Sequence, residues 1–144
     1  MPVSEAFVGY GSKIGYETSA GSGVYTTLGE VKSIKPGSPS AGEAEVTHLE
    51  SPGGFKEFLA TLKDGGEVAI TINLVPSNAT WTAIKSKLAS GVREAWQIQL
   101  ANTAASKITY AAAFVKQVEM GEISAESPAE ATITLRIAGD WTWS

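Results

Sequence analysis

Two segments alternate apolar and polar residues so strictly that they constrain the fold more than any other feature of the chain. In residues 67–74 (EVAITINL) every second side chain is apolar, and residues 130–137 (EATITLRI) follow the same rule. Successive side chains of a β-strand point to opposite faces, so each segment is predicted to be a strand with one buried face. Strands of this kind are typical of antiparallel sheets that are covered on one side.

Further strands are expected on weaker patterns. They are predicted at residues 28–34, 43–49, 93–101 and 109–120. In the last of these, Tyr110, Ala112 and Phe114 are expected on one face, with a bend near Lys116. Turn-forming residues separate the segments, among them Lys35-Pro36-Gly37.

One helix is predicted at about residues 79–90. Trp81, Ile84 and Leu88 recur at helical spacing and are expected to form its buried stripe. Ser77 or Asn78 is placed to cap the free N–H groups, and Gly91 supplies the stop.

A shorter helix is expected immediately before residues 67–74. Phe55, Phe58, Leu59 and Leu62 follow the i, i+3, i+4, i+7 pattern, and Asp64-Gly65-Gly66 would end the helix.

Glycine and other small or polar residues fill the first 24 positions, so residues 1–24 are predicted to form a flexible arm and residues 25–144 the folded domain. The arm carries Phe7, Tyr10 and Tyr16, which are candidates for contacts with the domain or with a neighbouring subunit. The predicted fold class is mainly β: an antiparallel β-sandwich or open barrel flanked by one main α-helix.

Composition excludes several classes of function. The net charge is -4, and Arg93 and Arg136 are the only arginines, which argues against binding nucleic-acid phosphates. Cysteine is absent, so disulfides and thiolate chemistry are excluded. We expect no signal peptide and no membrane span, and synthesis in the host cytoplasm.

Catalytic chemistry is sparse in the sequence. His48 is the only histidine, and no triad or metal-ligand spacing surrounds it. The only aspartates, Asp64 and Asp140, sit where turns are predicted. We therefore expect no enzyme, no catalytic or metal-binding residues and no cofactor.

The chain ends with two tryptophans that share a strand face. Trp141 and Trp143 are two residues apart and could form a ligand-binding platform. Packing on the core or on a neighbouring subunit is the favoured interpretation.

The order of these segments, over residues 25–143, resembles the major tail tube proteins of long-tailed bacteriophages. The run LKDGGEV (residues 62–68) carries most of the resemblance. The strand with Trp96 and Ile98, the Phe114-Val115 pair, the TITLRI segment (132–137) and the Gly-Asp-Trp ending carry the rest. Some members have an additional C-terminal Ig-like domain, which we do not expect here.

The resemblance implies a structural virion protein of the phage tail. Six subunits would close a ring, and stacked rings would form a hollow tube through which DNA passes without specific binding. The expected partners are copies of the chain itself and the tail-tip, tape-measure and tail-terminator proteins. Trp141, Trp143 and the three aromatic residues of the arm are the candidate contacts between subunits. The candidates for the lumen, where carboxylates would repel DNA, are Glu43, Glu45, Glu94, Glu119 and Glu130; the alternative is that they face the outer solvent.

Two other functions stay open at this point. The tube protein of the type VI secretion system has a similar fold and ring. A small ligand-binding β-sandwich, with the C-terminal tryptophans as its platform, is the second alternative.

Overall fold

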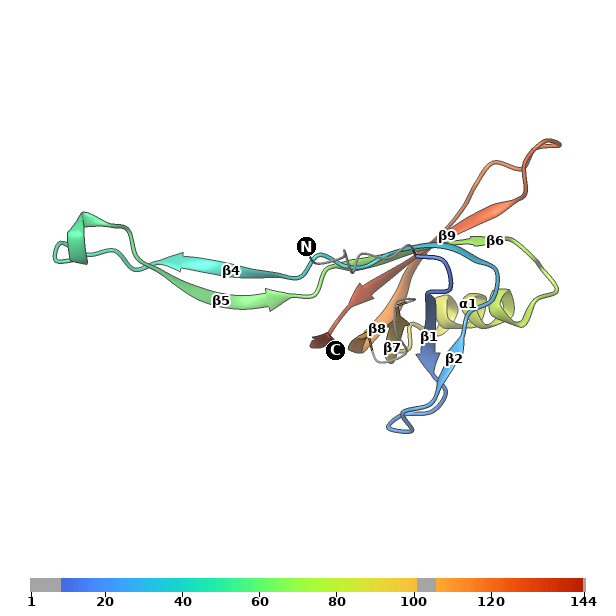
Figure 1. Cartoon of the computed structure of the whole chain (residues 1–144), viewed down its shortest axis with the longest axis horizontal. Helices are drawn as coiled ribbons and strands as arrows, with labels where there is room; N and C mark the ends of the chain where they lie inside the picture. The colour runs from blue at the N-terminus through green and yellow to red at the C-terminus, as the bar shows by residue number, and fades with distance from the viewer. Residues whose placement is uncertain (1–8, 101–105, 144) are drawn as a thin grey trace, which may run out of the picture.

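A computed structural model describes residues 9–100 and 106–143 of the chain. These residues form an antiparallel β structure with one α-helix and a long hairpin that projects from the body (Figure 1). In chain order the elements are β1 (Lys13–Glu17), β2 (Tyr25–Thr27), β3 (Val31–Lys35), β4 (Ser40–Glu45), the 3₁₀ turn η1 (Pro52–Gly54), β5 (Phe58–Asp64), β6 (Glu67–Asn73), α1 (Ala79–Ser90), β7 (Glu94–Gln99), β8 (Lys107–Met120), β9 (Glu130–Ile137) and β10 (Trp141–Trp143).

The body is built on one sheet whose strand order is β2-β1-β7-β8-β9-β6-β3, with β10 paired to the first part of β8. The two edge strands, β2 and β3, are joined by residues 28–30 alone. Four Cα–Cα steps span at most about 14 Å, so the two edges of the sheet must approach each other. The sheet therefore curls around its core without closing into a barrel. The prediction of a mainly β, antiparallel fold with one main helix is confirmed.

The core lies on the concave face of the curled sheet. Along β6 the side chains of Val68, Ile70 and Ile72 are buried, and Ala69 and Thr71 between them are partly exposed. In β9 the same alternation buries Ile133 and Leu135, which confirms both strands predicted from it. Burying such a side chain contributes roughly 1.5–3 kcal/mol, so this face supplies most of the stability of the body.

Helix α1 covers the core with Trp81 and Ile84. Its start is capped by Asn78, whose Oδ1 accepts a hydrogen bond from the Thr80 N–H at 2.8 Å. Its end is capped by Gly91 in the left-handed region, with φ 64°. The predicted bounds are confirmed, but Leu88 of the expected buried stripe is 42% exposed, because the last turn of the helix extends past the core.

The cap gives a direct prediction for stability. Replacing Asn78 with alanine leaves the Thr80 N–H without its acceptor and should lower the free energy of unfolding by about 1 kcal/mol. Urea unfolding followed by circular dichroism measures the change. The Asn78→Asp variant, which keeps an acceptor, should lose much less; equal losses in the two variants would contradict the capping role.

The helix predicted over residues 55–62 is wrong. The structure places β5 there, paired with β4, after the short turn η1. The i, i+3, i+4, i+7 pattern suggested one apolar face on a core, but Phe55 and Leu62 are 76% and 90% exposed. The body of the chain does not pack against this segment, so no buried surface favours a helix with one apolar face. The strand expected at 43–49 overlaps β4, which starts three residues earlier and ends at Glu45.

In β8 the predicted face of Tyr110, Ala112 and Phe114 is also wrong. Tyr110 is buried, but Ala113 and Val115 are the next buried residues. The pairing with β7 shifts register between Glu94 and Trp96, and this bulge turns the strand by one residue. A second register shift, between Val115 and Gln117, coincides with the bend expected near Lys116.

Within the predicted N-terminal arm, residues 1–8 lie outside the described residues. Lys13–Glu17 forms β1, which pairs with β7 and β2 inside the main sheet. Ile14 is fully buried in the core. This part of residues 1–24 therefore belongs to the folded body, because its alternate apolar residues complete the concave face.

Candidate functional site

The hairpin of β4 and β5 is the part of the structure least explained by the stability of the body. It pairs only with itself, and every residue of both strands is exposed. Figure 1 shows it extending well beyond the main sheet. A two-stranded hairpin without a core is marginally stable in water. A surface on which the hairpin could dock would supply the stability that it lacks alone.

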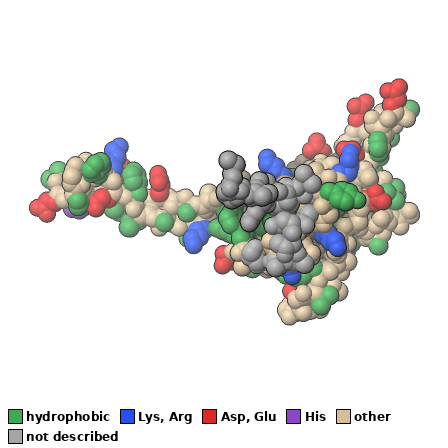
Figure 2. Space-filling view, in the orientation of Figure 1, with side chains coloured by type: hydrophobic (Ala, Val, Ile, Leu, Met, Phe, Trp, Pro, Cys, Tyr) green, Lys and Arg blue, Asp and Glu red, His purple; other side chains and the backbone are tan. Residues whose placement is uncertain are grey.

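One face of the hairpin carries an apolar strip, formed by Val46, Leu59 and Leu62. Ala44 lies opposite Leu59, and the Val46 N–H donates to the Glu57 carbonyl at 2.8 Å. Side-chain alternation then places Val46 and Leu59 on the same face. The bulge between Ala60 and Lys63 adds one residue to β5 and brings Leu62 to that face as well. Apolar side chains gather along the hairpin in Figure 2. Exposed apolar surface of this kind marks an interaction site.

The opposite face of the hairpin is more polar. Glu43 lies opposite Ala60, and Glu45 lies opposite Phe58. Two of the five glutamates predicted for the lumen thus share the face away from the apolar strip. This arrangement makes the hairpin amphipathic, so a partner that covers the strip leaves both carboxylates in solvent.

The base of the hairpin is packed tightly against the body. A Cβ atom on Gly37 would lie 2.8 Å from the Gly65 carbonyl oxygen, so only glycine allows these two segments of the chain to approach this closely. Asp64 accepts from the Gly66 N–H at 2.8 Å and from Arg136 of β9, Nη2 to Oδ2, at 2.9 Å. These contacts fix the direction in which the hairpin leaves the sheet.

The same contacts set a pH dependence at the base. The Gly66 N–H, and after it the Arg136 guanidinium, lower the pKa of Asp64 below its usual range. A lowered pKa in the folded state means that the stabilisation is present above the ordinary aspartate value of about 3.9 and is lost as pH falls through the lowered value. The Asp64→Asn variant should therefore be less stable than the unmodified protein at about pH 7, and the difference should shrink at about pH 2.5. Urea unfolding at both pH values measures it; a constant difference would contradict the assignment.

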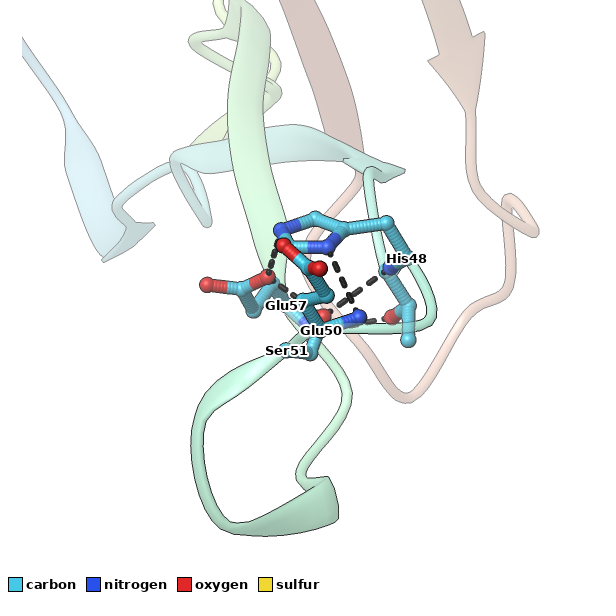
Figure 3. A network of polar contacts seen from close by, with 5 residues as sticks. His48, Glu50, Ser51 and Glu57 are labelled. Carbon is cyan, nitrogen blue, oxygen red and sulfur yellow. Dashed lines mark hydrogen bonds and ion pairs between the residues drawn. The ribbon is translucent and has the colours of Figure 1, made fainter.

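At the tip of the hairpin, polar contacts gather around His48 (Figure 3). The His48 N–H donates to Ser51 Oγ at 2.9 Å, and the Ser51 hydroxyl donates to Glu57 Oε2 at 2.6 Å. The Glu50 N–H donates to His48 Nδ1 at 3.1 Å, and His48 Nε2 lies 3.4 Å from Glu57 Oε2. Ser51 bonds to the carboxylate and not to the imidazole, so the group lacks the order of a catalytic triad. These contacts stabilise the turn at the tip of the hairpin.

The other glutamates predicted for the lumen are not brought together. Glu94 lies on the helix-covered side, where Lys87 Nζ approaches its Oε2 to 2.6 Å. Glu119 lies near the end of β8 and Glu130 at the start of β9, so the two are at the same end of the sheet. Both are on its uncovered face beside Thr132. Glu130 forms an ion pair with Lys32. The five carboxylates therefore occupy three separate regions of the chain.

The aromatic residues predicted for contacts between subunits also occupy different environments. Tyr10 is 94% exposed, whereas Tyr16 packs edge-to-face on Trp96 at 5.6 Å and lies beneath Lys87. Trp141 packs against the core, and the side chain of Trp143 is largely exposed. Phe7 lies outside the described residues.

The described part of the chain gives no sign of a metal centre. No cluster of three or more potential metal ligands occurs among residues 9–100 and 106–143. A hollow of about 610 Å³ near Val31, Ile34, Ile98 and Leu100 has no carboxylate or imidazole in its lining. No helix in this part of the chain has the length and hydropathy needed to cross a membrane.

Known proteins resemble the chain in sequence pattern and in fold. Residues 9–144 match the model of the family described as lambda phage tail tube protein. No curated protein sequence matches it significantly.

Solved structures share the fold at low sequence identity. The tail of an empty gene transfer agent particle, determined with C6 symmetry, is similar over 96% of this chain and 99% of its own, with 18% identity and a TM-score of 0.73. The SPP1 tail tube matches over 92% and 77%, with 15% identity and a TM-score of 0.62. A type six secretion system protein matches over 92% and 81%, with 12% identity and a TM-score of 0.57.

Proposed function

The chain belongs to the lambda phage tail tube protein family, and from this premise we propose that its copies form six-membered rings that stack into a hollow tube through which DNA passes. The family consists of structural proteins, so the chain is a structural component of a virion tail and not an enzyme.

The observation that carries the proposal is the amphipathic hairpin. Leu59 and Leu62 are 59% and 90% exposed on a hairpin that the body does not support. Fully burying a leucine side chain contributes roughly 1.5–3 kcal/mol, so docking of the apolar strip on a neighbouring copy is a substantial source of association energy. The tight base at Gly37 and Gly65 supports this role, because it fixes the direction in which the hairpin leaves the body before it docks.

Docking of the hairpin on a different part of a neighbour is a heterologous contact. Such contacts close into rings when the rotation permits and otherwise continue as open filaments. A stacked tube uses both outcomes, one within each ring and one along the axis. The likeness to a C6-symmetric tail favours six subunits in each ring.

The uncovered face of the main sheet suits the wall of a DNA conduit. Thr71 of β6 and Thr132 and Thr134 of β9 are adjacent on it, as the strand register shows. The threonine hydroxyls are uncharged, and three cations on this face are paired with carboxylates: Lys32 with Glu130, Lys116 with Glu67 and Arg136 with Asp64. Lys35, opposite Ala69, is a further cation on this face, and Glu119 adds a negative charge at one end. We assign this face, with Glu119 and Glu130, to the lumen; Glu43 and Glu45 reach it only if the polar face of the hairpin also turns inward.

Proteins that cap, start and measure a tail are the further partners proposed. The tail-tip, tape-measure and tail-terminator proteins would contact the first ring, the lumen and the last ring. The ends of a stacked tube expose unpaired hairpins or unfilled docking surfaces, which such proteins would cover.

Electron microscopy of the purified full chain, with light scattering over a range of concentrations, tests the proposal. Hollow tubes or six-membered rings of uniform width are the expected result. Compact closed dimers, in which the apolar strip is paired with itself, would overturn it. If the chain stays monomeric, fragments of tube assembled in cells that express it should act as seeds; failure with seeds also overturns the proposal.

A further inference from the structure

The tip of the hairpin is built around the one histidine of the chain. His48 and Ser51 bracket a turn in which the Ser51 N–H donates to the His48 carbonyl at 3.1 Å. Ser51 is buried although the tip projects into solvent. Leu49, fully exposed, lies within the same turn, so the geometry of the turn decides how this apolar side chain is presented.

The imidazole ring uses its two nitrogens in different ways. Nδ1 accepts a hydrogen bond from the Glu50 N–H at 3.1 Å, so Nδ1 carries no proton in this arrangement. The proton of the neutral ring is then on Nε2, which faces Glu57 Oε2 at 3.4 Å (Figure 3). The observed turn thus requires one tautomer of the uncharged imidazole.

Protonation would change both contacts in opposite directions. A proton on Nδ1 would face the Glu50 N–H, and two donors cannot share a hydrogen bond. On the other side of the ring, the positive charge would strengthen the attraction to the Glu57 carboxylate. The protonated ring is therefore attracted more strongly to Glu57 and loses its hydrogen bond with the Glu50 N–H. The turn between His48 and Ser51 then has one stabilising hydrogen bond fewer.

We propose that His48 is a pH-sensitive latch that holds the hairpin tip in its docking conformation when uncharged and releases it when protonated. Imidazole is the side chain that ordinarily changes its charge between pH 5 and 8. The link from the latch to assembly rests on the proposed function, because it assumes that the tip docks on a neighbouring copy. Mild acid would then slow tube formation by altering the presentation of Leu49.

The charged neighbours of the ring on both strands are few. Glu57, on the segment leading into β5, is the carboxylate in contact with it, and Glu50 supplies its backbone N–H from the turn. Lys56 adjoins Glu57 in the sequence, but among the described residues it forms no ion pair with the ring or with Glu57. The Thr47 hydroxyl accepts from the Glu57 N–H at 2.9 Å and is not titratable.

NMR titration of the full chain, at concentrations below assembly, tests the latch directly. As the His48 ring protonates, the Glu50 amide should lose its hydrogen bond, and its protection from hydrogen exchange should fall about fivefold, the effect of one hydrogen bond of ordinary strength. A Glu50 amide whose exchange does not follow the ring would overturn the proposal. This measurement needs no assembly, so its result is independent of whether the chain forms tubes.

The matched variant is His48→Asn. An asparagine side chain can accept from the N–H two residues on, so it keeps the Glu50 contact but cannot titrate. From about pH 7.5 to about pH 5.5, the light-scattering rate of assembly should fall about fivefold in the unmodified protein and stay within about twofold in the variant. An equal pH response in both proteins, or faster assembly of the unmodified protein in acid, would overturn the latch. If neither protein assembles at any pH even with seeds, the proposed function fails while the Glu50 exchange still decides the latch.

Discussion

Replacing both leucines of the apolar strip with glutamine (Leu59→Gln/Leu62→Gln) should keep the protein monomeric where the unmodified chain assembles. Each side chain would lose roughly 1.5–3 kcal/mol of burial in the docked state, so the association constant should fall at least about a hundredfold. Both side chains are exposed in the monomer, so thermal unfolding should be nearly unchanged. Light scattering and electron microscopy measure assembly, and circular dichroism measures unfolding.

The polar face of the same hairpin supplies the control. Phe58→Gln/Ala60→Gln changes two neighbouring positions of β5 that point away from the strip. This variant should assemble with a threshold concentration close to that of the unmodified protein. If it fails to assemble while the leucine variant succeeds, the wrong face of the hairpin has been assigned to the contact.

The second large effect concerns the core. Trp96 of β7 is 1% exposed and packs edge-to-face against Tyr16 of β1. Truncation to alanine should lower the free energy of unfolding by about 3–5 kcal/mol, because the rigid sheet cannot collapse into the space left behind. The thermal midpoint should fall by about 10–20 °C. Calorimetry of the monomer gives both quantities.

Trp143 provides the matched comparison for this variant. Its side chain is 63% exposed on β10, so the same truncation should change the free energy of unfolding by less than about 1 kcal/mol. Similar losses for Trp96 and Trp143 would mean that the core is not centred where the structure places it.

The elements that the sequence predicts well are those whose signals are local and whose burial occurs within the same chain. The alternation of β6 and β9 and the helix between Asn78 and Gly91 depend only on side-chain direction and on the capping of free backbone groups. Both kinds of signal can be read from the sequence without knowing which strands pair. The bulge beside Trp96 is different, because it arises from the register between β7 and β8, and it moved the buried positions of β8 by one residue.

The hairpin shows where sequence reasoning fails for a physical reason. Phe58, Leu59 and Leu62 fit a helical period, but spacing identifies an element only when a core selects one face. Here the apolar face is left exposed by the body, so helix and strand were equally compatible with the pattern. The available signal was Glu43–Glu45 followed by an acidic, glycine-containing tip and a second apolar run, which is the layout of a long hairpin.

The sequence did not reveal the apolar strip. Self-association was inferred from the resemblance, whereas the apolar strip became visible only through the pairing of Ala44 with Leu59. The glutamates predicted for the lumen were chosen as polar residues on strands, and strand polarity alone does not distinguish the uncovered face of the sheet from the helix-covered side that holds Glu94. His48 lacked any motif, because its partners come from both sides of a turn.

The isolation of the hairpin from the body has a kinetic consequence. When two free copies meet, a hairpin of marginal stability must become ordered to form a single contact. Fixing the backbone of one residue costs about 1–2 kcal/mol. A copy that joins an existing end meets several neighbours at once for the same ordering cost. Growth should therefore show a lag that preformed fragments remove, and a trace without a lag would contradict this. In such a regime the number of seeds, and not the affinity between copies, sets how many tubes a given supply of subunits builds.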